Sequence, residues 1–117
     1  VKIHVSNKTS DLTCLRSVFH FSDAEKEMIT KHHDKIKHIE AAGSSLKACL
    51  IAEGKAEISY RLSAGTKEWD TAAFQIIVEE AGGLVLKPNK ERMTYNREDV
   101  YNREGYLIIN NIDNFLL

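Results

Sequence analysis

One stretch, residues 68–83, constrains the fold of this chain more than any other. It reads Glu-Trp-Asp-Thr-Ala-Ala-Phe-Gln-Ile-Ile-Val-Glu-Glu-Ala-Gly-Gly. Residues at spacings of three and four predict a helix with one mostly apolar stripe, formed by Ala73, Ile76, Ile77, Glu80 and Ala81. The carboxylate of Asp70 can accept hydrogen bonds from the free amides of the first turn, so we expect Asp70 to cap this helix. Gly82 suits the left-handed residue just beyond the last turn.

The composition is that of a folded domain. The chain has 117 residues, of which 43% are hydrophobic and 28% charged, and this is enough to build a core. The 16 basic and 17 acidic residues leave a net charge of -1, which excludes the basic footprint of a protein that binds nucleic-acid polymers. No apolar run approaches the roughly 20 residues of a membrane span. We therefore expect one domain, residues 1–117, without a nucleic-acid polymer or a membrane as partner.

The cysteines indicate a reducing compartment. Cys14 and Cys49 are too few for a disulfide framework. Cys49 stands among apolar residues, and we expect it to be a small buried thiol. The simplest location for such a chain is the cytoplasm.

Strand-like and helix-like segments alternate along the chain. A Ser22–Glu25 capping box introduces the first expected helix. The expected helices are 23–33, 46–53 and 70–81, and the expected strands are 1–5, 36–41, 56–62, 83–86 and 106–109, with 93–95 as a further short candidate. The run at 106–109 is the most apolar, so we expect it to lie centrally. This order predicts an α/β layered fold with a mixed, mostly parallel sheet of about five strands and about three helices.

The run Gly43-Ser44-Ser45-Leu46-Lys47 has the features of an anion site. A glycine lets the backbone turn sharply, and two serines place hydroxyls and free amides at a helix start. Lys47 adds a compact positive charge close by. The alternative is a plain serine cap with a lysine on the surface. Ligands of α/β sheets gather where strands lead into helices, and both this run and residues 68–70 are expected at such places.

Two motifs together resemble a known family. Trp69-Asp70-Thr71-Ala72-Ala73, followed by Glu80-Ala81-Gly82-Gly83, is similar to the carboxy-terminal signature of the inositol monophosphatase superfamily of metal-dependent phosphatases. Residues 43–47, followed by Ile51-Ala52-Glu53-Gly54-Lys55-Ala56, resemble one branch of it, the 3′(2′),5′-bisphosphate nucleotidases. These enzymes remove a phosphate from 3′-phosphoadenosine 5′-phosphate. The resemblance covers residues 40–110 well and the first 40 poorly, and the motifs are specific only as a pair.

The resemblance implies roles for individual residues. Gly43, Ser44, Ser45 and Lys47 would bind substrate, because Ser44 and Lys47 match positions that contact the nucleotide phosphate. Arg61 matches a further nucleotide contact, with a solvated arginine at a strand edge as the alternative. Asp70 matches a magnesium ligand, with an N-cap alone as the alternative.

The resemblance also implies that part of the machinery is absent. In the family the other Mg²⁺ ligands are a glutamate and the aspartates of an Asp-Pro-x-Asp-Gly-Thr motif in the amino-terminal half. This chain contains no Asp-x-Asp-Gly. One carboxylate cannot supply the octahedral oxygen ligands of Mg²⁺. We therefore expect the carboxy-terminal half of a two-part phosphatase of sulfur assimilation, with no complete set of catalytic residues and no activity alone.

Other interpretations remain open at this point. The partner of the chain would be a nucleotide or another small phosphorylated substrate, together with the missing amino-terminal half. The alternatives are a non-catalytic module that binds a nucleotide or a partner, and a fragment of an inositol-phosphate phosphatase.

Two departures from the family weaken the adenine-nucleotide interpretation. The nucleotidases carry a Ser-x-Ser-His-like segment, whose histidine contacts the nucleotide, after the strand that matches residues 1–5. Here the segment Ser6-Asn7-Lys8-Thr9 has no histidine. Phe74 stands where the superfamily usually has glycine, and we expect it to crowd the site.

Overall fold

The structure, a computed structural model, describes residues 3–17, 23–61, 68–87, 90 and 105–116. For Ser17, Ser44, Ser45 and residues 68–73 it describes the backbone alone. The elements within these ranges are β1 (Leu12–Ser17), α1 (Asp23–Lys31), β2 (Ile36–Ala42), α2 (Ser44–Ala52), β3 (Ile58–Arg61), α3 (Glu68–Glu80), β4 (Leu84–Leu86), β5 (Tyr106–Ile109) and the 3₁₀ turn η1 (Ile112–Asn114). The predicted α/β fold is confirmed, while the candidate strand at 93–95 lies outside the described residues.

The five strands form one mixed sheet in the order β2-β1-β3-β5-β4. β1 is parallel to both β2 and β3, whereas β5 is antiparallel to both β3 and β4. Four of the five strands therefore run in one direction and β5 runs opposite to them, so the predicted mixed, mostly parallel sheet is confirmed. All four residues of β5 are buried, as expected for an apolar run with a strand on each side. The middle position, however, belongs to β3.

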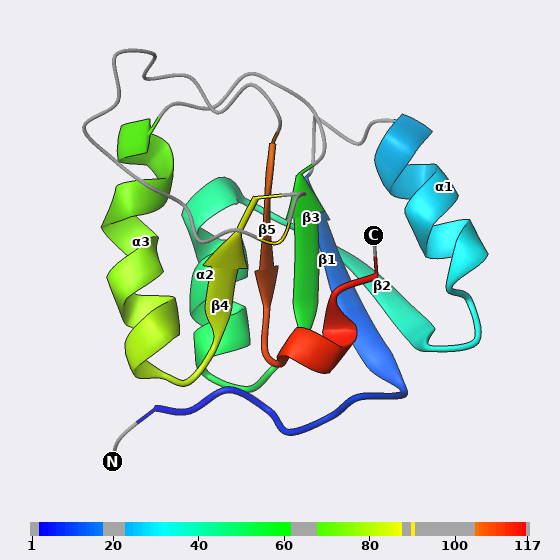
Figure 1. Cartoon of the computed structure of the whole chain (residues 1–117), viewed down its shortest axis with the longest axis horizontal. Coiled ribbons are helices and arrows are strands. Elements are labelled where there is room, and N and C mark those ends of the chain that lie inside the picture. Colours follow the sequence, from blue (N-terminus) through cyan, green and yellow to red (C-terminus); the bar gives the residue numbers. More distant parts are fainter. Residues whose placement is uncertain (1–2, 18–22, 62–67, 88–89, 91–104, 117) are drawn as a thin grey trace.

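Helices cover both faces of the sheet (Figure 1). On one face, α2 and α3 pack on a core that includes Leu15, Ile51, Val78, Val85 and Ile108. On the other face, α1 and the C-terminal segment pack on a core that includes Leu12, Met28, Ile58, Leu107 and Phe115. Consecutive residues of β5 enter opposite cores because side chains alternate along a strand.

The predicted start and stripe of α3 are wrong in register. The helix begins at Glu68, so Asp70 lies in the first turn and not at the cap. Ile76 and Ile77 are 64% and 42% exposed. Among residues 74–81, whose side chains are described, the buried ones are Phe74, Gln75, Val78 and Ala81, and of these only Ala81 belongs to the predicted stripe. Two stripes in this helix share the helical period, and contact with α2 and β4 selects the one that carries the phenylalanine. Gly82 does take the predicted left-handed conformation, with φ +96°.

The first strand was also misplaced. Residues 3–8 are described and contain no strand, although Val5 is buried and its N–H donates to the carbonyl of Ala81 at 2.9 Å. The first strand is β1, which lies between β2 and β3. Both faces of β1 are covered, since Cys14 and Leu15 enter opposite cores. An interior strand of this kind does not show the alternation that identifies a half-exposed one.

A set of buried amides joins the two ends of the described chain. The Asn110 side chain donates to the carbonyls of Ser6 (2.8 Å) and Lys8 (3.0 Å). The Asn114 side chain donates to the carbonyl of Lys8 at 2.9 Å. The Tyr60 hydroxyl donates to the Asn114 carbonyl at 2.6 Å. Phe115 and Leu116 then pack on the core.

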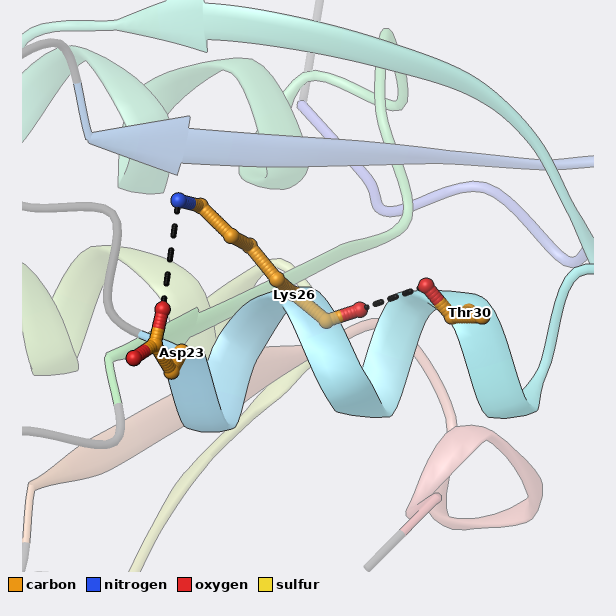
Figure 2. Close-up of polar contacts among 3 residues, drawn as sticks. All are labelled: Asp23, Lys26 and Thr30. Carbon is orange, nitrogen blue, oxygen red and sulfur yellow. Dashed lines mark hydrogen bonds and ion pairs between the residues drawn. The ribbon is translucent and has the colours of Figure 1, made fainter.

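Figure 2 shows two contacts within α1. The Lys26 ammonium lies 4.0 Å from the Asp23 carboxylate, and both side chains are exposed. The Thr30 hydroxyl donates to the Lys26 carbonyl at 2.9 Å. Exposed pairs of this kind contribute at most about 1 kcal/mol. The helix is held instead by its buried residues Glu25, Met28 and Ile29.

The burial that was expected for Cys49 is found at Cys14 instead. Cys14 is buried, whereas Cys49, which we expected to be buried, is half-buried, and both are free thiols. Among the described residues, no helix combines the length and the apolar character needed to cross a membrane.

Candidate functional site

Three helices begin at one edge of the sheet (Figure 1). β1, β2 and β3 are parallel, so their last residues, Ser17, Ala42 and Arg61, lie at that edge. α1, α2 and α3 follow these strands in the chain. The first turn of each helix has free N–H groups and the positive end of the helix dipole. The edge therefore favours a negatively charged ligand, as the position of both motifs predicts.

Gly43 is the N-cap of α2, with φ −66° and ψ 163°. This backbone conformation is open to any residue, so the sharp turn we expected from the glycine is not there. Apart from Gly43 and its two chain neighbours, the described part of the chain has no heavy atom within 4 Å of the place where a Cβ would stand. The glycine thus leaves free space in front of the helix. The backbones of Ser44 and Ser45 form the first turn behind it, as predicted, and their side chains lie outside the described part.

Lys47 and Arg61 are both buried. They are 2% and 8% exposed, respectively. The alternatives of a surface lysine and a solvated arginine are therefore wrong. Lys47 lies in the first turn of α2, and Arg61 is the last residue of β3, opposite Tyr106 of β5. Two buried cations on adjacent elements are unusual because burial penalises charge unless a partner compensates it.

The two cations influence each other. The pKa of the Lys47 ammonium is lowered, mainly by burial and then by the positive charge of Arg61. Glu25, only 2% exposed, acts in the opposite direction. The Arg61 Nε is buried and has no hydrogen-bond partner. Lys47, Arg61 and Glu25 thus bring two cations and one carboxylate together, and the Nε–H of Arg61 is available to donate to a ligand.

Glu25 is a member of this group that the sequence did not reveal. It was expected only as the second half of a capping box with Ser22, which lies outside the described residues. Its carboxylate is close enough to Lys47 and Cys14 to affect the pKa of both. Because it comes from α1 and they come from α2 and β1, no local spacing relates them.

Cys14 is not a nucleophile. It is 1% exposed, and burial raises the pKa of its thiol to about 12, with Glu25 adding to the rise and Lys47 opposing it. The reactive form of cysteine is the thiolate. The thiol therefore stays protonated at neutral pH and serves as a small apolar core group.

The described residues do not form a magnesium site. Among them, no three His, Cys, Asp or Glu side chains are placed to hold a metal ion. The backbone of Asp70 lies in the first turn of α3, at the edge where the other motif lies, and its side chain is outside the described part. A Mg²⁺ ion needs several oxygen ligands, so no catalytic step can be assigned to a metal held by these residues.

The structure changes the interpretation of both departures from the family, Phe74 and the missing histidine. Phe74 is 4% exposed, and its ring centroid lies 5.9 Å from that of Tyr106, so it belongs to the core and does not crowd the site. The first strand is β1, so the segment that follows it is Ser17-Val18-Phe19-His20, which ends in histidine. Residues 18–20 lie outside the described part. The argument from a missing histidine at residues 6–9 nevertheless loses its basis.

Comparisons with known proteins agree with this picture. The sequence model of the inositol monophosphatase family matches residues 2–113. The 3′(2′),5′-bisphosphate nucleotidase CysQ of Buchnera aphidicola is 51% identical over 61 residues, which is 50% of this chain and 23% of that protein. The inositol monophosphatase of Mesembryanthemum crystallinum is 34% identical over 97 residues, which is 76% of this chain and 36% of that protein.

A solved structure has the same fold. CysQ from Bacteroides thetaiotaomicron, described as a bacterial member of the inositol monophosphatase family, superposes with a TM-score of 0.76 at 33% identity. The superposition covers 86% of this chain and 38% of that one. The chain thus spans between 23% and 38% of the length of these three relatives.

Proposed function

The chain belongs to the inositol monophosphatase family, and we propose from this premise that it is the phosphate-binding, carboxy-terminal part of a phosphatase. The proposed substrate of the whole enzyme is 3′-phosphoadenosine 5′-phosphate, which it would convert to AMP and phosphate. Support for this branch comes from residues 43–47 and from relatives that are named bisphosphate nucleotidases. The segment after β1 contains a histidine, His20. The main argument against an adenine nucleotide is therefore removed.

One observation carries the proposal. The buried Arg61 Nε has no partner, beside a buried Lys47 whose pKa Arg61 lowers. A phosphate group placed between them would accept a hydrogen bond from the unpaired Nε and offset the mutual repulsion of the two cations. Charge-assisted hydrogen bonds to phosphate are among the strongest in proteins. The free space at Gly43 and the amides of Ser44 and Ser45 lie at the same helix start.

We assign the residues as follows. Lys47 and Arg61 hold the phosphate of the nucleotide that is not cleaved, and Ser44 and Ser45 donate to its oxygens. Asp70 contributes one carboxylate to a magnesium site whose other ligands come from outside this chain. Magnesium would activate water for attack on phosphorus. This chain alone therefore binds substrate without hydrolysing it.

The test is a titration of this chain with adenosine 3′,5′-bisphosphate, followed by backbone amide NMR shifts. We expect binding in about the millimolar range, with the largest shifts at residues 43–47 and at Arg61. Lys47→Met should weaken binding about tenfold or more, because it removes a charge-assisted contact. Lys55→Met is the matched control, since Lys55 is exposed and paired with Glu53 at 3.2 Å.

Two results would contradict the proposal. One is unchanged affinity in Lys47→Met with a folded spectrum, and the other is a set of shifts confined to residues far from this edge. Release of phosphate by this chain alone, in proportion to protein and dependent on magnesium, would refute the assignment of hydrolysis to the whole enzyme.

A second candidate substrate is an inositol phosphate. The observation that favours it is the match to an inositol monophosphatase over 76% of this chain. Titration with inositol 1-phosphate in the same NMR experiment separates the two. Binding at residues 43–47 tighter than that of the nucleotide would transfer the assignment to this substrate.

A further inference from the structure

Four charged side chains are buried in the part of the chain whose side chains the structure describes. They are Glu25, Lys47, Glu57 and Arg61. Glu57 stands just before β3, where its carboxylate accepts a hydrogen bond from the Thr13 N–H at 2.8 Å. The other three belong to the edge where the helices begin, since Glu25 and Lys47 lie in the first turns of α1 and α2 and Arg61 ends β3. A buried charge is costly unless an opposite charge compensates it, so a carboxylate at this edge is expected to act on the two cations.

The position of Glu25 on α1 directs its side chain inward. Glu25, Met28 and Ile29 are the buried residues of the helix, and their spacing of three and four places them on one side of it. Met28 and Ile29 pack in the core of that face. Glu25 lies one turn closer to the helix start, at the edge of the sheet (Figure 1). The helix dipole does not explain its burial, because Asp23 lies in the same first turn and its side chain is exposed.

The two cations reach this edge from the opposite face of the sheet. Tyr60 belongs to the core under α1, so Arg61, the next residue of β3, points to the face that α2 covers. Lys47 comes from α2 itself. The strands end at this edge, and the charges act on each other there. Burial and then Arg61 lower the pKa of Lys47, whereas Glu25 raises it.

A buried lysine needs such a carboxylate if it is to bind an anion. Burial and a second cation both favour the neutral amine of a lysine, whereas an arginine keeps its charge. A neutral amine has lost the charge-assisted contact that makes phosphate binding strong. A carboxylate within reach favours the ammonium form again.

The groups that act on Lys47 come from three of the surrounding elements. They are the guanidinium of β3, the carboxylate of α1 and the thiol of β1, which belong to Arg61, Glu25 and Cys14. The thiol carries no charge at neutral pH, because burial raises its pKa to about 12. The side chains of residues 68–73, in the first half of α3, lie outside the described part. Among the described groups, Glu25 is therefore the one that favours a charged Lys47 at neutral pH.

We propose that Glu25 is a positioning residue of the anion site, whose carboxylate is the counter-ion that holds Lys47 as an ammonium ion ready to receive a phosphate. The role of the phosphate in this statement rests on the proposed function. Glu25 itself does not touch the substrate and acts through Lys47. The site then draws one charged residue from α1, one from α2 and one from β3, so α1 belongs to the binding machinery and is not only a cover for the sheet.

The direct test measures the protonation of Lys47 without any ligand. In a chain labelled with ¹³C at the lysine Cε atoms, the Lys47 signal is assigned by its loss in Lys47→Met and followed from about pH 7 to about pH 11. Glu25→Gln, which keeps the shape and removes the charge, should lower the pKa of Lys47 further. Glu25→Asp keeps the charge and should titrate above Glu25→Gln. Glu27→Gln is the matched control, because Glu27 is exposed on the same helix and should leave Lys47 unchanged.

A second measurement asks whether the protonation matters for binding. The affinity for adenosine 3′,5′-bisphosphate is measured across the same pH range in the original chain, Glu25→Gln and Glu27→Gln. In Glu25→Gln the affinity should begin to fall at a lower pH, by about tenfold for each further pH unit, because binding then has to return a proton to Lys47. A merely structural role of Glu25 would change the affinity equally at every pH. If no chain binds the nucleotide, the proposed function fails, while the titration of Lys47 still decides the role of Glu25.

A double-variant cycle covers the case in which Glu25→Gln does not fold. Without the carboxylate, Lys47 and Arg61 are left as two buried cations, so adding Lys47→Met should restore the fold. If Glu25→Gln does fold, Lys47→Met should lower its urea midpoint less than it lowers that of the original chain. Three results would overturn the proposal: the same titration of Lys47 in the original chain and Glu25→Gln, equal titration in Glu25→Gln and Glu25→Asp, or a cost of Lys47→Met that is the same in both backgrounds. An unfolded double variant beside an unfolded Glu25→Gln would do so too.

Discussion

Because the thiol of Cys14 is buried, the free energy of unfolding of this protein should fall as the pH rises above 9.0, the ordinary pKa of a thiol. The folded pKa of the thiol is raised from its ordinary value of 9.0 to about 12. A raised pKa means that the folded chain keeps a proton that the unfolded chain loses. The stabilisation is therefore complete below pH 9 and is lost as the pH rises toward 12.

The magnitude follows from these two pKa values. At pH 10 the unfolded thiol is largely ionised and the folded one is not, so the free energy of unfolding falls by about 1.4 kcal/mol. At pH 11 the loss grows to about 2.7 kcal/mol. Cys14→Ala removes this dependence. It also adds a cost of about 1–2 kcal/mol for the lost sulfur, and that cost does not vary with pH.

The assay is urea unfolding followed by circular dichroism at about pH 8 and about pH 10. The quantity to compare is the difference between the original chain and Cys14→Ala, because other titrating groups such as Tyr60 contribute to both. This difference should shrink by about 1.4 kcal/mol between the two pH values. Cys49→Ala, which changes a half-buried thiol, should retain the loss seen in the original chain. Equal pH dependence in the original chain and Cys14→Ala would show that burial does not hold the thiol protonated.

Three further predictions concern stability. Gly83→Ala should cost about 1–3 kcal/mol by urea unfolding, whereas Gly43→Ala should stay within about 0.5 kcal/mol. The reason is that a Cβ at Gly83 would lie 2.9 Å from a Val78 methyl and 3.0 Å from the Ile109 carbonyl, while at Gly43 it would meet nothing within 4 Å. Tyr60→Phe should cost about 1–3 kcal/mol, because it leaves the carbonyl of Asn114 and the N–H of Leu116 without their partner. An unchanged urea midpoint would contradict this. The pKa of Lys47 is lowered from 10.5, so the folded chain loses this proton at a lower pH than the unfolded chain does. The free energy of unfolding therefore rises with pH between the lowered pKa and 10.5. Lys47→Met should remove that rise, and an identical pH profile in the variant would refute it.

Local features of the sequence determined where the helices end. Gly54 and Gly82 both adopt positive φ, +81° and +96°, just beyond α2 and α3. Glycine takes this conformation without the steric cost that other residues meet, so its position is a reliable stop signal. The two motifs were also sufficient to place the chain in its family, because each is a run of consecutive residues.

The tertiary structure decided which residues are buried. Along α3 the sequence allowed two apolar stripes, and the structure buries the one with Phe74 while Ile76 and Ile77 stay exposed. β1 escaped recognition because both of its faces are covered and Thr13 and Arg16 interrupt its apolar residues. The choice in each case depends on contacts with other elements, which a local window cannot contain.

The same limit applies to the candidate site. The sequence determined that residues 43–47 begin a helix and that Lys47 and Arg61 were candidates for binding an anion. Only the fold decided that both are buried and that Glu25 of α1 joins them, with Arg61 Nε left unpaired. Backbone preferences extend over three or four residues, whereas burial and pKa depend on charges that the parallel strands and their helices bring to one edge from distant parts of the chain.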